Sequence, residues 1–360
     1  MEQFACRTRI VSGPGAIQVL GQQSCRRLLV AAEDRFADTQ MLRQILLAAG
    51  NPETVILSDV DAEPTVAQTV EGSRKIREFQ PDLVAAVGGR HVLDWGKAMV
   101  CFSKHSCLLA TIPALLGAGS EITGCATLTH NGRRHLFRDV GMCPDIAILD
   151  HGLTGTAPKS TVAEGGFELL SAALEAYTGE NGSFLNRLHA REAFVSGCAA
   201  LPAAFSGNAA GFRRMQMASV LSGLAADESG QGFCRAMQNS LGTIFGLSRG
   251  KAAAILLPAL IGCNAHAAGR RYAELSRAAG MGGSREEIGI RNLKTGLVRL
   301  RRELGLPGTL VQAGLDIRSV WNNGRRFVEL TLEDPECRNN PVAVDDFMVR
   351  RILEEITGRF

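Results

Sequence analysis

Short segments that are apolar throughout recur in the first 150 residues, and segments with helical periodicity separate them. The clearest apolar segments cover residues 28–32, 81–89 and 106–113. A strand that is apolar on both faces is typical of a parallel sheet, because helices cover both sides of such a sheet. We therefore expect a doubly wound, Rossmann-like α/β domain of the dinucleotide-binding type over residues 1–155.

The character of the sequence changes after Pro158. Segments become long, rich in Ala and Leu, and helical in their periodicity, with few clusters of β-branched residues. The strongest helical patterns lie at residues 161–182 and 230–258. These features predict an all-helical domain over residues 156–360.

Composition narrows the classes of function. The chain has 360 residues, of which 46% are apolar and 21% are charged, and its formal net charge is only +3. No block of Lys and Arg is long enough to follow a phosphate backbone, so we expect no nucleic-acid binding. The longest apolar run, residues 252–263, is too short to span a bilayer and contains Pro258. We expect a soluble, cytoplasmic protein with no membrane partner.

The ten cysteines are scattered and form no Cys-x-x-Cys pair. This pattern indicates a reducing compartment in which most cysteines are small core residues. Cys234 stands next to Arg235, and two interpretations remain open for it. It is either a buried inert thiol or a thiolate favoured by the neighbouring cation.

Several motifs, in order along the chain, resemble those of the iron-dependent alcohol dehydrogenases. They include SGPGA, GGRHVLDWGKA, ATIPALLGAGSEIT and CPDIAILD in the first half, and ECRNNP near the end. The combination of SGPGA, DAEPT and ECRNNP is most similar to the propanol and ethanol dehydrogenases of bacterial microcompartments. The resemblance implies an NAD cofactor, a homodimer or larger assembly, and a catalytic paralogue or microcompartment enzymes as candidate partners. It also allows a bacterial microcompartment as the location.

In that family, one Asp and three His hold a single divalent metal. The resemblance places Glu168, Ala172, Arg235 and Arg249 at these four positions, and Asn239 where a further His lies near the nicotinamide. Alanine has no donor atom, and a guanidinium group has no lone pair to give a metal. We therefore expect neither iron nor zinc.

Two interpretations of the arginines remain open. A divalent metal with one carboxylate carries a net charge of +1, and so does Glu168 with Arg235 and Arg249. In the first interpretation both guanidinium groups pair with Glu168 in the space of the metal. In the second the site has drifted, and both arginines point into solvent.

The functional expectation has two forms. The first is a catalytically impaired, non-metal relative that acts as an accessory subunit in small alcohol or aldehyde metabolism. The second is a metal-independent, NAD(H)-linked oxidoreductase of a small aldehyde or alcohol. In that form Arg235 or Arg249 is the electrophile in place of the metal, with Glu168 and Asn239 beside it.

This chain keeps some of the residues that the resemblance places at the family's dinucleotide-binding positions. A pyrophosphate needs exposed backbone N–H groups at a strand-to-helix turn, where glycine lets it approach. Asp34 stands where the family's strand-end Asp meets the adenosine ribose, although a helix N-cap is the alternative interpretation of Asp34. Arg90 and His91 replace the third Gly and the Ser of the family turn, so the resemblance implies a weakened NAD site. Its candidate residues are Asp34, Gly88, Gly89, Arg90, His91, Asp94, Lys97 and Ser120.

Overall fold

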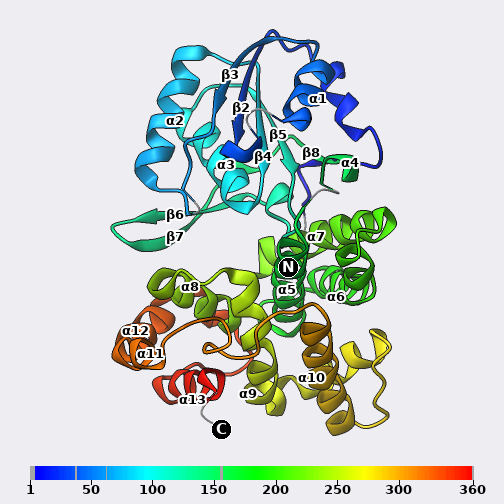
Figure 1. Ribbon diagram of the computed structural model, residues 1–360, viewed down its shortest axis with the longest axis vertical. Helices are drawn as coiled ribbons and strands as arrows, with labels where there is room; N and C mark the ends of the chain where they lie inside the picture. Colours follow the sequence, from blue (N-terminus) through cyan, green and yellow to red (C-terminus); the bar gives the residue numbers. More distant parts are fainter. Residues whose placement is uncertain (1–4, 37–38, 62, 155–156, 359–360) are drawn as a thin grey trace. The chain divides into compact units, whose positions relative to one another are not determined.

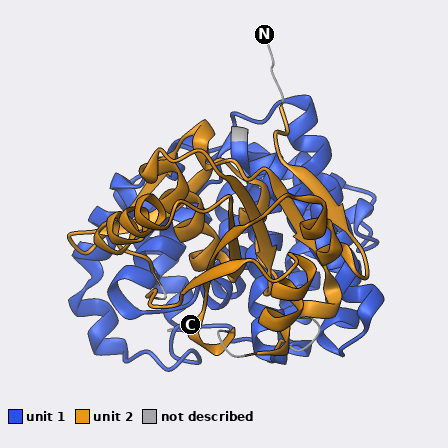
Figure 2. Ribbon diagram, turned by 90° about the horizontal axis from the view of Figure 1, so that it is seen from above, with its two compact units in different colours: residues 1–4, 158–360 blue, residues 5–157 orange. Residues whose placement is uncertain are grey.

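The structure is a computed structural model that describes residues 5–36, 39–61, 63–154 and 157–358. These residues form two compact units that meet in sequence between Ala157 and Pro158, close to the boundary expected at residue 155. Figure 2 colours the two units separately. The expected limits at residues 1–4 and 155–156 lie outside the described residues. Each unit is described by itself below.

The first unit contains a six-stranded sheet in which every described pair of neighbouring strands is parallel. This confirms the predicted doubly wound α/β fold. In spatial order the strands are β1 (Arg9–Ser12), β8 (Ile146–Leu149), β5 (Leu108–Pro113), β4 (Leu83–Gly88), β2 (Arg27–Ala32) and β3 (Glu53–Leu57).

Alternate residues of the central strands bury opposite faces of the sheet. Leu28 and Val30 of β2 pack into the core with η1 (Ala16–Gln22) and α1 (Gln40–Ala48). Leu29 of the same strand packs on the other side with α2 (Val66–Phe79) and α3 (Arg90–Ser103). Side chains alternate across a strand, so the apolar run Leu28–Ala32 of β2 serves both layers. Figure 1 shows α1 and α2 on opposite sides of the sheet.

Short elements complete the first unit. Asn131 and Gly132 both have positive φ, 50° and 69°, as a two-residue hairpin turn requires. They join β6 (Cys125–His130) to the antiparallel strand β7 (Arg133–Arg138). The other short elements are η2 (Asp34–Phe36), η3 (Ser120–Ile122), η4 (Val140–Met142) and α4 (His151–Thr154).

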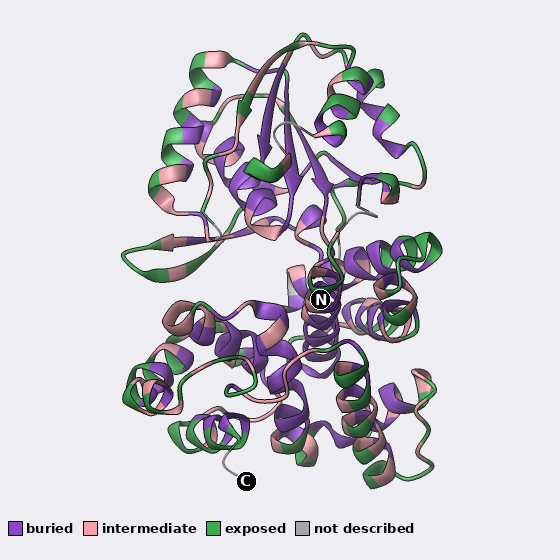
Figure 3. Cartoon of the chain, in the orientation of Figure 1, coloured by how far each residue is buried: buried purple, intermediate pink, exposed green. Residues whose placement is uncertain are grey.

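The second unit is helical, and no strand occurs among its described residues. This agrees with the all-helical prediction. Its helix α5 is buried along most of its length, as the purple ribbon in Figure 3 shows. The elements are α5 (Lys159–Thr178), α6 (Phe184–Phe205), α7 (Ala209–Ser229), α8 (Phe233–Phe245), α9 (Arg249–Ala278), α10 (Glu286–Glu303), α11 (Ile317–Asn322), α12 (Gly324–Glu333), η5 (Pro335–Asn339) and α13 (Asp346–Thr357).

The expected helical segment 230–258 is two helices rather than one. Gly246 takes the left-handed conformation, with φ of 66°, and ends α8. Ser248 then begins α9 as an N-cap, since its side chain accepts the N–H of Lys251. By length and composition α9 could cross a membrane, but its most apolar stretch is 72% buried within the protein. Helix α9 is therefore a core helix of the protein.

Candidate functional site

The first candidate site is the turn between β4 and α3. Gly88 ends β4 with φ of 154°, a conformation that favours glycine, and Gly89 is the N-cap of α3. Helix α3 begins at Arg90, directly after this glycine pair. Free N–H groups at such a helix start are suited to binding an anion.

A carboxylate of the same chain already lies at this turn. Gly89 donates its backbone N–H to Oε1 of Glu33 over 2.8 Å. The other oxygen of Glu33 pairs with Nε of Arg35 at 2.5 Å, and Nε2 of His91 lies 3.7 Å from Oε1. Burial is the main cause that lowers the pKa of His91, which favours the neutral ring.

Sequence reasoning chose Asp34 and missed its neighbour Glu33. Asp34 begins η2 and is exposed, whereas Glu33 is partly buried at the end of β2. The alternative interpretation of Asp34 as the cap of the next helix is wrong, because Thr39 is the N-cap of α1. The usable signal was position, since Glu33 follows β2 directly and β2 lies beside β4. The ribose role of Asp34 stays a prediction.

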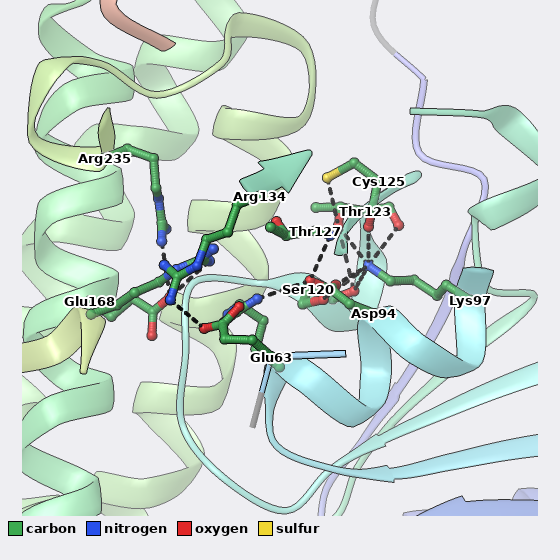
Figure 4. Close-up of polar contacts among 12 residues, drawn as sticks. Glu63, Asp94, Lys97, Ser120, Thr123, Cys125, Thr127, Arg134, Glu168 and Arg235 are labelled. Carbon is green, nitrogen blue, oxygen red and sulfur yellow. Dashed lines mark hydrogen bonds and ion pairs between the residues drawn. The ribbon is translucent and has the colours of Figure 1, made fainter. Parts of the chain in front are cut away.

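Arg90 forms ion pairs with two carboxylates. Its guanidinium lies 3.2 Å from Oδ2 of Asp94 and 3.1 Å from Oε1 of Glu63. Nη2 of Arg134 approaches the same oxygen of Glu63 at 2.9 Å, and Figure 4 draws this pair. Glu63 is thus a second acidic residue near the turn that sequence reasoning missed.

Asp94, Lys97 and Ser120 come together as an internal network (Figure 4). The ammonium of Lys97 lies 3.0 Å from Oδ1 of Asp94 and donates to Oγ of Ser120 at 2.9 Å. Ser120 in turn donates to Asp94, as does the backbone N–H of Thr127. Burial would raise the pKa of Asp94, but Lys97 and Arg90 lower it to about 2. The network joins α3 to the segment that leads into β6.

The second candidate site lies where α5, α8 and α9 meet. Nη1 of Arg235 is 3.2 Å from Oε1 of Glu168, and Nη1 of Arg249 is 3.9 Å from the same oxygen. The exposed fractions of the side chains are only 6% for Arg235, 7% for Arg249 and 13% for Glu168. Both distances are within ion-pair range, and neither arginine points into solvent. Figure 4 shows the guanidinium of Arg235 directed at Glu168.

Two local features place the arginines. Glu175 accepts the backbone N–H groups of Cys234 and Arg235, at 2.5 Å and 3.2 Å, and so caps the start of α8. Gly250 lets the start of α9 approach α5, because a Cβ there would lie 2.3 Å from the carbonyl oxygen of Glu164. These contacts set both guanidinium groups against Glu168.

Glu175 is a further residue that sequence reasoning missed as a site residue. Burial raises its pKa to about 8, although the N–H of Cys234 and the charge of Arg235 oppose the shift. The available signal was its place in the sequence, three residues after the expected metal position Ala172. Arg235 is also held by Gln231, whose Oε1 accepts the Nε–H at 2.6 Å.

Glu168, Arg235 and Arg249 form what we call the Glu168 cluster. The other two predicted residues, Ala172 and Asn239, do not contribute donor atoms to it. Ala172 is fully buried one turn after Glu168, and the amide of Asn239 donates to Oδ2 of Asp334 at 2.8 Å. Cys234 is buried, and burial and Glu175 raise the pKa of its thiol well above the usual value, which favours the buried inert thiol over the thiolate.

The donor set does not fit a divalent metal. Of the four residues at the expected metal positions, only Glu168 has a ligating atom, and a guanidinium group already lies against it. Within the described ranges, no group of three or more His, Cys, Asp or Glu side chains is arranged to hold a metal ion. One carboxylate with two permanent cations carries a net charge of +1, and this net charge repels a dication.

Comparisons with known proteins cover both units. Residues 7–151 match the family "Iron-containing alcohol dehydrogenase", and residues 162–357 match "Fe-containing alcohol dehydrogenase family, C-terminal". The 1-propanol dehydrogenase PduQ of Citrobacter freundii is 29% identical over 99% of this chain and 100% of its own. The NADPH-dependent butanol dehydrogenase of Clostridium saccharobutylicum is 24% identical over 98% of this chain and 97% of its own. The expected likeness to propanol dehydrogenases is thereby confirmed.

Solved structures agree on the fold. An iron-containing alcohol dehydrogenase from Thermococcus thioreducens superposes with a TM-score of 0.90 at 26% identity, covering 99% of this chain and 100% of the other. A sulfoacetaldehyde reductase from Bifidobacterium kashiwanohense in complex with NAD⁺ gives 0.89 at 21% identity, with both chains fully covered. Family matches in both units, in the expected order, leave one assignment. The chain belongs to the iron-containing alcohol dehydrogenase family.

Proposed function

We propose that this chain is a non-metal member of its family, impaired in alcohol oxidation, that serves as an accessory subunit in small alcohol or aldehyde metabolism. The observation that carries the proposal is the buried pair between Arg235 and Glu168. The carboxylate that could ligate a metal is bound by a guanidinium group instead.

The chemistry of the replaced residues explains the impairment. In the family the metal binds the alcohol oxygen and lowers its pKa, which favours the alkoxide from which hydride leaves. A guanidinium group stays protonated and offers N–H donors, so it can orient an oxygen but cannot coordinate it. It also polarises an oxygen less strongly than a dication does. Arg235 and Arg249 are therefore better suited to binding the oxygen of a ligand than to promoting the oxidation of an alcohol.

The accessory role follows from what the chain retains. The cluster at Glu168 is packed and ion-paired, as expected of a maintained site rather than an eroded one. Curated relatives include propanol and butanol dehydrogenases, which favours a setting in short-chain alcohol metabolism. We place the protein in the cytoplasm or in a bacterial microcompartment, as a homodimer or with a catalytic paralogue.

Restoring the ligands tests the proposal. Purified protein is reconstituted anaerobically with Fe²⁺ or with Zn²⁺, desalted, and analysed for metal by mass spectrometry. We expect well below one metal per wild-type chain. The variant Glu168→Asp/Ala172→His/Arg235→His/Arg249→His should hold about one. The matched control Arg235→Ala/Arg249→Ala removes the cations without adding imidazoles, and should stay low. Stoichiometric metal in the wild type would overturn the proposal.

A second candidate function rests on the convergence of two guanidinium groups on one carboxylate oxygen. Their N–H donors could polarise the carbonyl of a small aldehyde during NADH-linked reduction. This function predicts turnover that chelators leave unchanged and that Arg249→Ala abolishes. If purified wild-type protein shows no NADH-dependent loss of propionaldehyde, this candidate is excluded for that substrate.

A further inference from the structure

We infer that Glu33 closes the dinucleotide turn of this chain, because its carboxylate takes the backbone N–H that a phosphate oxygen would otherwise accept. NAD(H) binding is then weak in the wild type and improves when Glu33 is removed. The inference is independent of the Glu168 cluster and of the proposed accessory function.

The geometry of the turn is the first step. A glycine pair at a strand-to-helix turn leaves room for an anion above the backbone. Here Glu33 fills that room. A Cβ built on Gly88 would lie 3.0 Å from Oε1 of Glu33, and a Cβ on Gly89 would lie 3.3 Å from the same atom. A carboxylate of the chain itself thus occupies the space above the glycine pair.

Charge is the second step. The N–H of Gly89 already donates to Glu33 over 2.8 Å, a charge-assisted hydrogen bond at the start of a 14-residue helix. A diphosphate would have to displace this carboxylate or approach it against like-charge repulsion. Either route lowers the affinity for the dinucleotide.

The surroundings hold Glu33 in place. Arg35 pairs with its second oxygen at 2.5 Å, so the carboxylate is fixed from two sides. Arg90, which replaces a glycine of the family turn, does not offset the negative charge at the turn, because it binds Glu63 and Asp94. The residues around the turn therefore do not fit a dinucleotide pyrophosphate while Glu33 keeps this position.

The test is a titration of NADH fluorescence, repeated with NAD⁺ by calorimetry, on the full-length chain. We expect Glu33→Ala to bind NADH at least tenfold more tightly than wild type. Glu33→Gln removes the charge but keeps an acceptor, so it should fall between the two. The matched control Glu71→Ala removes an exposed carboxylate of α2 in the same unit and should bind as wild type does. Circular dichroism verifies that each variant is folded.

Several results would overturn the inference. These are equal or weaker binding by folded Glu33→Ala, no measurable binding by any variant, and wild-type affinity that already equals that of Glu33→Ala. Should Glu33→Ala fail to fold, Glu33→Asp replaces it, because the shorter side chain withdraws the carboxylate from Gly89. Metal content tests the proposed function, and NADH affinity tests the role of Glu33. The failure of one proposal can therefore be told from the failure of the other.

Discussion

Nη1 of Arg235 lies 3.2 Å from Oε1 of Glu168, and this buried pair joins the start of α8 to the middle of α5. A buried ion pair is costly to break, since removing one partner leaves the other charged and desolvated. The pair therefore constrains both residues together, whatever the site binds.

Arg235→Met should lower the free energy of unfolding by on the order of 3 kcal/mol, because Glu168 loses a buried guanidinium partner 3.2 Å away. The double variant Arg235→Met/Glu168→Gln should regain part of this loss, because residue 168 no longer carries a buried charge that has lost its nearer partner. Urea denaturation of the wild type, both single variants and the double variant gives the coupling free energy between Arg235 and Glu168. Additive effects would show that the two residues do not interact.

Lys97→Met should destabilise the first unit by about 3 kcal/mol, since Asp94 loses a buried cation 3.0 Å away. Adding Asp94→Asn removes the unpaired charge and should restore part of the stability. Lys75→Met in α2 is the control: it removes the same charge from the same unit at a partly exposed position, and should cost less than about 1 kcal/mol. Equal losses for Lys97→Met and Lys75→Met would contradict the network.

The stability of the wild type should fall between pH 5 and pH 8.5 relative to Glu175→Gln. The folded pKa of Glu175 is about 8, against 4.5 for the ordinary side chain, so the folded state binds the extra proton between these values. Its contribution to stability is complete below the lower pKa and is lost as pH rises through the upper one. The slope is at most about 1.4 kcal/mol per pH unit.

Chemical denaturation at four or five pH values measures the Glu175 effect. Glu71→Gln provides the control, because Glu71 is exposed and its pKa lies below the window. Parallel pH profiles for wild type and Glu175→Gln would show that Glu175 does not hold a proton in the folded state at neutral pH.

Gly250→Ala should cost about 1–3 kcal/mol or more, because its Cβ would lie within 2.5 Å of backbone atoms of Glu164 and force α9 away from α5. Gly262→Ala in the same helix meets only the flexible end of Lys294 at 3.8 Å, and should be neutral or stabilising by up to about 1 kcal/mol. Thermal unfolding compares them. Similar melting temperatures would refute the close approach at Gly250.

Sequence reasoning predicted the architecture because the signals are local. The apolar run of β2 and the helical periodicity after Pro158 are properties of neighbouring residues, and they report which surfaces must be buried. The break between α8 and α9 was missed, although Gly246 and Ser248 carry ordinary end and start signals for helices. There the helical pattern expected over residues 230–258 concealed the boundary.

The candidate sites were only partly predictable. Motif order located Glu168, Arg235 and Arg249, but it left open whether the arginines face the carboxylate or the solvent. At the dinucleotide turn, motif order pointed to Asp34, whereas Glu33 is the residue that accepts the backbone N–H of Gly89. Adjacent residues of an extended segment point in different directions, so an offset of one residue changes which side chain reaches a site.

By itself, the sequence determined the class of the fold and the chemical identity of the residues at the positions where the resemblance expects metal ligands. Periodicity and side-chain type are properties of the individual residues, so both can be read without the folded structure. Only the tertiary structure decided the pairing of Glu168 with Arg235, which are 67 residues apart, and of Glu33 with Gly89, which are 56 apart. Such contacts depend on how α5 packs against α8 and how β2 lies beside β4. Packing is a property of the whole folded chain, and no local pattern of residues encodes it.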